Sequence, residues 1–487
     1  MSTRRALLFS FLDRYSGLVI SVVSSMVIAR LLPPSELGIF SVAMALLLLA
    51  STVRDMGAGQ YIVQVQELTP ARISAVWTIQ IGIGASLALL TAAAAIPAAR
   101  FYEEPKITGV LAVMAIGYLI NPFGSIAYAL LMREMRFERI ALMRFSAALS
   151  SAAVSITLAY RGHGVMSLAW GSLAATVVNA LIAQWVRPSD TPWGLNFKGV
   201  PEVMGFSGRI AGTSVITTVV NSTPDFLLGK FQDMHAAGLY SRSNGLVAMF
   251  SRLIMDAIQG VAVSFFSQQR RDGQDMKPAF LKAMSYITVL NWVFCALLAL
   301  LAFPLTGVLY GDQWDESVAL TRWLALGGAC AAPVTLCAIA CTAAGRTDLL
   351  MRATFIAGCF TACAAIAGTL HSLEMLGQLL ALASLCGTVI WLMTVRATVG
   401  FGWRELLAVL ARSASTTALA LLLPTGLMAL YFQDGPLNRL LTLILLGSFG
   451  LACAPMAALI GRHPIAAELR HVFKQTLGKT FIRKREN

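Results

Sequence analysis

Long uncharged stretches constrain the fold of this chain more than any other feature of its sequence. About 20 apolar residues cross the hydrocarbon core of a bilayer as an α-helix. Nine windows of at least that length contain no Asp, Glu, Lys or Arg: residues 73–99, 107–132, 162–186, 283–311, 323–345, 353–373, 375–395, 413–433 and 440–461. Five further apolar spans carry charge inside or close to their ends, near residues 10–31, 37–56, 140–160, 206–229 and 241–267. We therefore predict an all-α integral membrane protein with about fourteen transmembrane helices.

A twelve-residue pattern occurs twice, 200 positions apart, at residues 30–41 and 230–241. Each copy closes an apolar stretch with a cation, continues through a polar turn, and ends in a Gly-aliphatic-aromatic-Ser run that starts at Gly38 or Gly238. The pattern indicates a duplicated membrane hairpin, in which these two glycines begin equivalent helices. A chain built of two similar halves follows from it.

The distribution of Lys and Arg predicts the orientation, because cytoplasmic loops are enriched in these residues. With the N-terminus inside, 28 of the 37 cations fall in cytoplasmic segments, 8 fall on the opposite side, and Arg252 lies within a span. We expect both termini to be cytoplasmic and the first helix to remain uncleaved, since Asp13 and Arg14 interrupt its apolar run. The net charge of +13 then reflects topology and an affinity for anionic membrane lipid, and we expect no nucleic acid as a partner.

Loop lengths and composition predict a division into five parts. Residues 1–187 form an N-terminal six-helix bundle, and 188–204, which contain three prolines, form a cytoplasmic linker. A second six-helix bundle covers 205–396, two additional helices cover 397–461, and 462–487 form a basic tail. We expect this tail to be an amphipathic helix on the inner leaflet; a binding site for a cytosolic partner is the alternative.

Charged residues inside spans identify the candidate site, because a charge in the bilayer is costly and usually faces a wet interior. The spans that carry them are the first, second, seventh and eighth, which correspond in pairs under the duplication and therefore favour a shared central cavity. In the eighth span, residues at steps of three and four share one helical face: Arg242, Gly245, Met249, Arg252, Asp256 and Gln259. Arg252 lies ten residues from the predicted outer end, about 15 Å into the membrane.

Several motifs in order along nearly the whole chain resemble the Wzx-type oligosaccharide flippases of the multidrug/oligosaccharidyl-lipid/polysaccharide exporter superfamily. They lie at residues 29–40, 55–59, 68–70, 99–102, 133–137, 229–231, 237–241 and 309–314. The resemblance implies two pseudo-symmetric six-helix bundles around a central cavity, plus two C-terminal helices. It also implies the cargo, an undecaprenyl-pyrophosphate-linked glycan, and makes a polysaccharide polymerase and export machinery candidate partners.

Pyrophosphate chemistry then ranks the candidate residues, since a guanidinium offers a rigid fork of donors that matches phosphate oxygens. The substrate-binding candidates are Arg252, Arg14, Arg209, Arg54, Arg242, Asn221 and Gln259. The candidates for a coupling ion or a charge pair are Asp256, Asp225, Asp13 and Asp55. Structural alternatives remain open: Arg252 pairs with Asp256, the arginines near the inner boundary reach for headgroups, and the aspartates neutralise a nearby arginine.

Other functions fit the sequence less well. No phosphate-binding loop, dinucleotide fingerprint or nucleophile elbow occurs, and the eight cysteines show neither a zinc nor a disulfide pattern, so we expect no enzyme activity, cofactor or metal. A membrane polymerase would need a large outer loop, whereas the longest here is near residues 305–322. A lipid II flippase and a multidrug/cation antiporter of the same superfamily remain the alternatives, although an arginine-rich face does not suit cationic drugs.

Overall fold

The structure is a computed structural model that describes residues 17, 19–54, 58–187, 194–197, 199–272, 274–431, 436–461 and 463–467. This part of the chain is helical throughout, and eleven of its helices are long and apolar enough to cross a membrane. Two more, α8 (Val200–Phe231) and α9 (Met234–Arg271), have the length but carry charges, and a shorter apolar helix covers Val19–Leu31. The prediction of an all-α multi-pass membrane protein with about fourteen spans is confirmed.

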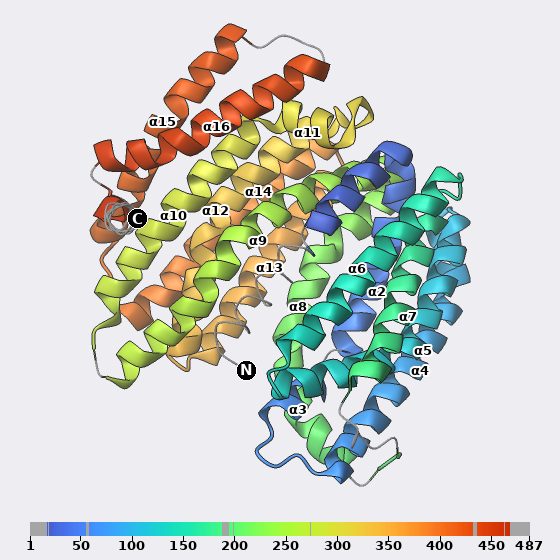
Figure 1. Cartoon of the computed structure of the whole chain (residues 1–487). Helices are drawn as coiled ribbons and strands as arrows, with labels where there is room; N and C mark the ends of the chain where they lie inside the picture. The colour runs from blue at the N-terminus through green and yellow to red at the C-terminus, as the bar shows by residue number, and fades with distance from the viewer. Residues whose placement is uncertain are drawn as a thin grey trace, which may run out of the picture. The chain divides into compact units, whose positions relative to one another are not determined.

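Packing divides the chain into two compact units, and the boundary in the sequence falls between Ser241 and Arg242. Unit 1 contains α2 (Pro34–Arg54), α3 (Ala58–Gln64), α4 (Pro70–Tyr102), α5 (Lys106–Arg133), α6 (Phe137–Tyr160), α7 (Met166–Val186), α8 and the start of α9. Within it α5 packs between α4 and α7, α6 covers α7, and α8 lies along α2 (Figure 1). This division places α8 with the first unit, and the five-part division expected from the sequence remains a prediction.

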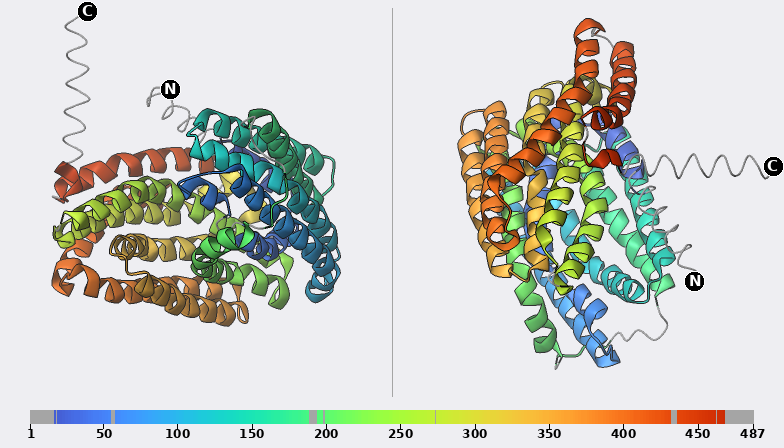
Figure 2. Two further views of the ribbon diagram at one scale, coloured as in Figure 1. Left: turned by 90° about the horizontal axis from the view of Figure 1, so that it is seen from below. Right: turned by 90° about the vertical axis from the view of Figure 1, so that its left-hand side faces the viewer.

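Unit 2 contains the rest of α9 and the helices that follow it. These are α10 (Met276–Leu300), α11 (Ala302–Tyr310), a 3-10 turn η1 (Asp312–Trp314), α12 (Ser317–Ala343), α13 (Thr347–Thr369), α14 (Leu373–Val399), α15 (Trp403–Tyr431) and α16 (Pro436–Ile460). Helix α14 packs between α12 and α13, α10 packs on α12 and α15, and α16 packs on α15 and α11 (Figures 1 and 2). The last two helices are thus attached to unit 2.

One uncharged window of the sequence contains a helix break. The uncharged window 283–311 is not one helix, because α10 ends at Leu300 and α11 begins at Ala302. The break is a consequence of Pro304, which has no N–H to donate to the carbonyl of Leu300 and whose ring would clash with it. The segment that looked like part of the longest outer loop is therefore ordered as α11 and η1.

A second proline is accommodated inside a helix. Pro333 in α12 cannot donate to the carbonyl oxygen of Ala329, and an unsatisfied carbonyl in hydrocarbon is expensive. The indole Nε1–H of Trp292 on α10 donates to that oxygen at 2.9 Å. Asn291, the residue before it, donates to the neighbouring carbonyl of Gly328 at 3.0 Å. Helix α10 therefore satisfies the carbonyl that Pro333 leaves without a donor in α12 and adds a second hydrogen bond beside it.

The turns of unit 1 gather at two ends, as alternating spans require. At one end, the Glu36 carboxylate accepts the backbone N–H of Val165 at 2.6 Å and pairs with Lys106, while Lys230 pairs with Glu103 at 3.0 Å. Helices α2, α5 and α7 start there, and α4 and α8 finish there. These are the turns that the cation count assigns to a single side of the membrane.

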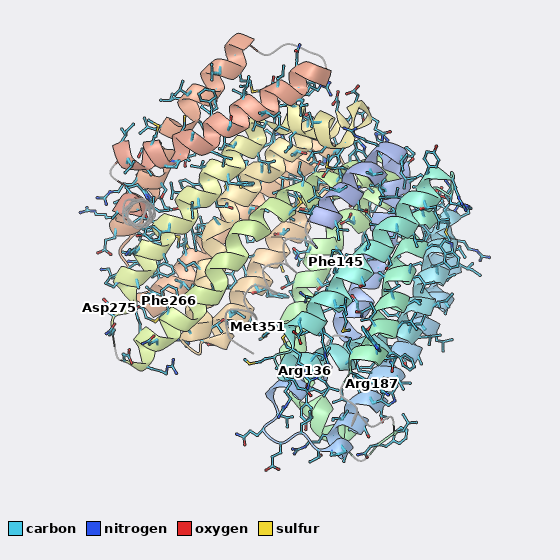
Figure 3. The ribbon with its side chains drawn as sticks, in the orientation of Figure 1. Arg136, Phe145, Arg187, Phe266, Asp275 and Met351 are labelled. Atoms are coloured by element: carbon cyan, nitrogen blue, oxygen red, sulfur yellow. The ribbon has the colours of Figure 1, made fainter. Side chains whose placement is uncertain are left out.

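The opposite end of unit 1 is held by Arg133, the last residue of α5. Its guanidinium donates to three carbonyl oxygens at and just beyond the end of α3, at 2.6 to 3.0 Å: Ile62, Val65 and Gln66. Arg136 and Arg187 lie at this same end (Figure 3). These three arginines therefore lie at one end of unit 1, and the orientation of that end in the membrane stays a prediction.

The duplicated hairpin has identical secondary structure in its two copies. Both preceding helices end at position 31 or 231, both turns cover two residues, and both following helices start at Pro34 or Met234. The two copies also touch each other, because a Cβ added to Gly38 would overlap the carbonyl oxygen of Met234 and one added to Gly238 would overlap that of Pro34. Position 38 thus meets 234 and position 238 meets 34, a reciprocal contact of the kind that a two-fold axis produces.

This contact tolerates no side chain at either glycine. Gly38→Ala should lower the melting temperature of the purified protein, because relieving the overlap requires a backbone displacement that costs about 1–3 kcal/mol. Gly82 in α4 is the matched control, since a Cβ there meets nothing within 4 Å. Equal melting temperatures for Gly38→Ala and Gly82→Ala would contradict the close packing of the two copies.

A buried polar cluster fastens the last two helices to α10. His463, just after α16 and 2% exposed, places Nε2 2.9 Å from the hydroxyl of Ser285 and 3.3 Å from that of Ser413. Ser413 on α15 also contacts the Thr288 hydroxyl of α10 at 2.8 Å. The His463 Nδ1 accepts the backbone N–H of Ile465 at 3.3 Å, which requires an imidazole that is unprotonated at that nitrogen.

Acid should weaken this attachment. Burial, and then the nearby positive charge of Arg412, lower the pKa of His463 below its usual 6.5. As the pH falls through about 6.5, the unfolded chain gains a proton that the folded chain excludes, so stability present above that pH is lost. The melting temperature should therefore fall less between pH 7.5 and 5.5 in His463→Gln than in the unsubstituted protein. His371→Gln, at an exposed histidine, should leave the pH dependence unchanged; equal pH dependence in all three proteins would refute the role of His463.

Candidate functional site

The structure describes only part of the predicted site residues, which belong to α8 and the end of α2 in unit 1 and to α9 in unit 2. Three of the predicted residues, Asp13, Arg14 and Asp55, lie outside the described residues. Five others have a described backbone but side chains outside the description: Arg54, Arg209, Arg252, Asp256 and Gln259. Arg54 ends α2 and Arg209 lies in α8, while the other three belong to α9. The side chains that the structure describes are Asn221, Asp225 and Arg242.

Helix α9 is continuous over 38 residues, so residues 242 to 259 at steps of three and four do share a face. Arg252 stands 18 residues after Met234, about 27 Å along the axis at 1.5 Å per residue. The helix begins eight residues before Arg242, which is earlier than the sequence suggested. Arg252 nevertheless occupies the middle of α9, and the hydrocarbon core covers about 30 Å of such a helix.

Asp225 of α8 is half-buried and faces α2. Its Oδ1 accepts the hydroxyl of Ser41 at 2.9 Å, and it lies within electrostatic range of Tyr102 and Tyr240. A neighbouring arginine was the simpler partner predicted for this carboxylate. Within the described part of the chain, its hydrogen-bond partner is the Ser41 hydroxyl. Ser41 is the last residue of the first duplicated motif, so the motif itself was the signal for this contact.

Thr218 is a second residue of α8 that contacts α2. Its hydroxyl lies 3.0 Å from that of Thr52, which is about three turns after Ser41 on α2. Asn221, three residues later, is exposed. Helix α8 therefore packs on α2 through Thr218 and Asp225, while Asn221 is exposed.

Arg242, at the start of unit 2, is enclosed by aromatic rings. Its guanidinium carbon lies 4.9 Å from the ring centre of Tyr310 and 5.5 Å from that of Trp314. Tyr310 is 6% exposed and Trp314 is fully buried. Sequence reasoning assigned these two aromatic residues no role, although both belong to the 309–314 motif that contributed to the resemblance.

The fold of solved exporters matches this architecture. A structure described as the lipid II flippase MurJ in an inward closed conformation is similar over 93% of this chain and 99% of its own, with a TM-score of 0.76 at 13% identity. A multidrug resistance MATE family transporter of the MOP superfamily in an inward-facing conformation covers 81% of this chain and 98% of its own, with a TM-score of 0.65 at 12% identity. The chain thus has the fold of the MOP exporters.

Sequence relatives narrow the class. The family model described as "Polysaccharide biosynthesis protein" matches residues 27–319, so the chain belongs to that family of polysaccharide flippases. The succinoglycan biosynthesis transport protein ExoT of Rhizobium meliloti (strain 1021) is 24% identical over 81% of this chain and 78% of its own. The lipopolysaccharide biosynthesis protein WzxC of Escherichia coli (strain K12) is 20% identical over 63% of each chain.

Proposed function

We propose that this protein translocates undecaprenyl-pyrophosphate-linked oligosaccharide repeat units from the inner to the outer leaflet by alternating access, for exopolysaccharide or lipopolysaccharide biosynthesis. The observation that carries the proposal is the family match over residues 27–319, which includes both copies of the duplicated hairpin. The polysaccharide-related names of ExoT and WzxC support the same class of cargo. A chain of this kind binds, carries and releases a lipid, and performs no bond-breaking chemistry.

The location follows from the same class of protein and from the distribution of charge. We place the chain in the bacterial cytoplasmic membrane, with both termini in the cytoplasm. The cation-rich end of unit 1, which contains Arg133, Arg136 and Arg187, would then contact the anionic lipids of the inner leaflet. A polysaccharide polymerase and the export machinery would receive the cargo on the other side.

Arg252 is the residue that we assign to the pyrophosphate. An uncompensated charge at mid-membrane costs about 2.5–3.5 kcal/mol on insertion scales, so such an arginine favours a wet path or an anionic ligand. Its guanidinium fork matches two phosphate oxygens at once. Arg14, Arg54 and Arg209 would receive or release the same group nearer the membrane surface, and Asn221 and Gln259 would contact sugars. Arg242, stacked on two rings, would fix the start of this face.

The lipid II flippase and the multidrug antiporter are less well supported. The likeness to MurJ is one of fold at 13% identity, whereas the curated relatives by sequence have names from polysaccharide biosynthesis. A cationic drug would need a path with negative charge, and the predicted face of α9 carries Arg242 and Arg252 against one aspartate.

Glycan export should depend on Arg252. Arg252→Ala should nearly abolish export and Arg252→Lys should reduce it, because lysine keeps the charge but loses the bidentate fork. Export and protein level should be measured in these variants and in the double variant Arg252→Ala/Asp256→Ala. If Arg252 serves only to pair with Asp256, removing both charges restores export, and that result would refute contact with the pyrophosphate.

Asp225 is our candidate for the coupling-ion site, since it is a half-buried carboxylate whose described partner is a hydroxyl. Asp225→Asn keeps an oxygen that can accept the Ser41 hydroxyl but removes the charge, so protein level should persist while export loses its dependence on an ion gradient. Ser41→Ala is the matched variant that removes the hydrogen bond and keeps the carboxylate. Gradient-dependent export that survives in Asp225→Asn would exclude this residue as the coupling site.

A further inference from the structure

The segment from Tyr310 to Asp315 holds two arginines that are nearly 200 positions apart in the sequence. It follows α11, turns at Gly311 with a positive φ of 96°, and continues through η1 into α12. Its aromatic side chains contact one arginine and its carboxylates contact the other. We call residues 310–315 the outer clamp, after the predicted side of the membrane.

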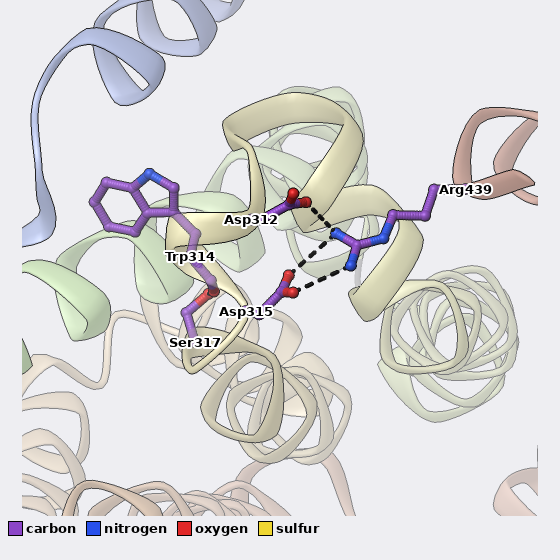
Figure 4. A network of polar contacts seen from close by, with 5 residues as sticks. All are labelled: Asp312, Trp314, Asp315, Ser317 and Arg439. Atoms are coloured by element: carbon purple, nitrogen blue, oxygen red, sulfur yellow. Dashed lines mark hydrogen bonds and ion pairs between the residues drawn. The ribbon is translucent and has the colours of Figure 1, made fainter. Parts of the chain in front are cut away.

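The carboxylate side of the outer clamp binds Arg439, near the start of α16 (Figure 4). Arg439 forms a two-point ion pair with Asp315, at 3.3 Å from Nη1 and 3.1 Å from Nη2, and Nη1 also donates to Asp312 at 2.7 Å. The guanidinium carbon lies 4.2 Å from the ring centre of Phe303 on α11. With a side chain only 12% exposed, this arginine is far better enclosed than an ordinary surface ion pair.

The aromatic side of the outer clamp binds the start of the α9 face. Tyr310 and Trp314 enclose Arg242, and their own rings are in edge contact at 6.1 Å. The next residue of α9, Ser243, donates to the carbonyl oxygen of Ser317 at 3.2 Å, and Ser317 in turn donates to the carbonyl oxygen of Trp314 at 2.6 Å. Helix α9 is therefore fixed to the outer clamp by two successive residues.

We propose that Arg439 is a positioning residue for transport: through the outer clamp, it couples the two C-terminal helices to α9, the helix that carries Arg252. The role in transport rests on the proposed function, whereas the coupling of the helices rests on the described contacts of unit 2. Arg242 and Arg439 contact different side chains of the same six consecutive residues. Helices α9 and α16 therefore move as one body at the outer clamp. The 309–314 motif then has a mechanical role, with no contact to the cargo.

The distance between α9 and α16 beside the outer clamp tests the coupling directly. In the full chain with its eight native cysteines replaced, spin labels at Asn244→Cys on α9 and Leu441→Cys on α16 would occupy two exposed positions. The label-to-label distance, measured in lipid nanodiscs, should be narrowly distributed, and Arg439→Ala should broaden it. Glycan export should fall by about tenfold at an unchanged protein level, since α16 would no longer hold the outer clamp, and with it α9, in position.

Two further variants distinguish coupling from general damage. Arg439→Lys keeps the charge without the two-point geometry and should recover part of both the narrow distribution and the export. Arg322→Ala, at an exposed cation in the first turns of α12, is the matched control and should change neither.

Loss of export with an unchanged distance distribution would overturn the proposal, and so would a broadened distribution with full export. If the unsubstituted chain exported no glycan, the proposed function would be wrong, and the distance measurement alone would decide whether Arg439 couples the helices.

Discussion

The structure depends on one constraint, namely that backbone N–H and C=O groups in hydrocarbon must find partners within the protein. Unbroken helices satisfy it over most of the chain, and the informative places are those where a helix cannot do so. At Pro333 the freed carbonyl of Ala329 is satisfied by Trp292 from the neighbouring helix. At Pro304 the chain instead ends one helix and starts another, which creates the segment that leads to the outer clamp.

Side-chain polar groups follow a related division. The described ion pairs lie at the ends of helices, as with Lys106, Lys230 and Arg439, where water or headgroups limit the cost of charge. Away from the ends, the described contacts between helices are mostly made by hydroxyls, as between Thr52 and Thr218. Against this background a mid-helix arginine such as Arg252 is unusual, and its position in α9 is the reason to assign it to an anionic cargo.

Much of the fold could be predicted because the length of an apolar stretch and the positions of Lys and Arg are properties of short segments of the sequence. The uncharged windows located the spans, and the duplicated motif located two turns to the residue. The uncharged window 283–311 contained a span but did not show where its helix ends, because charge alone does not detect a helix break at a proline. The reciprocal contact of Gly38 with Gly238 required knowing how the two copies pack, which no local pattern contains.

The site was less accessible to sequence reasoning, for a physical reason. Spacing on one helix groups residues such as Arg242 and Arg252, but it cannot say what faces them from another helix. For Asp225 the sequence left an ion site and a nearby arginine as alternatives, and it could not name the Ser41 hydroxyl that the carboxylate contacts because α8 lies along α2. Arg242 was expected on the substrate path and stacks on Tyr310 and Trp314, from a motif almost 70 positions away.

The most direct test of the central claim is lipid translocation by the purified chain. Proteoliposomes would be loaded with undecaprenyl-pyrophosphate-linked oligosaccharide or, in parallel, with lipid II, and the fraction that becomes accessible to an impermeant glycan-modifying enzyme would be followed in time. A polysaccharide flippase should move the oligosaccharide lipid much faster than protein-free liposomes do, and faster than lipid II. Equal rates with and without the protein, or a preference for lipid II, would contradict the account.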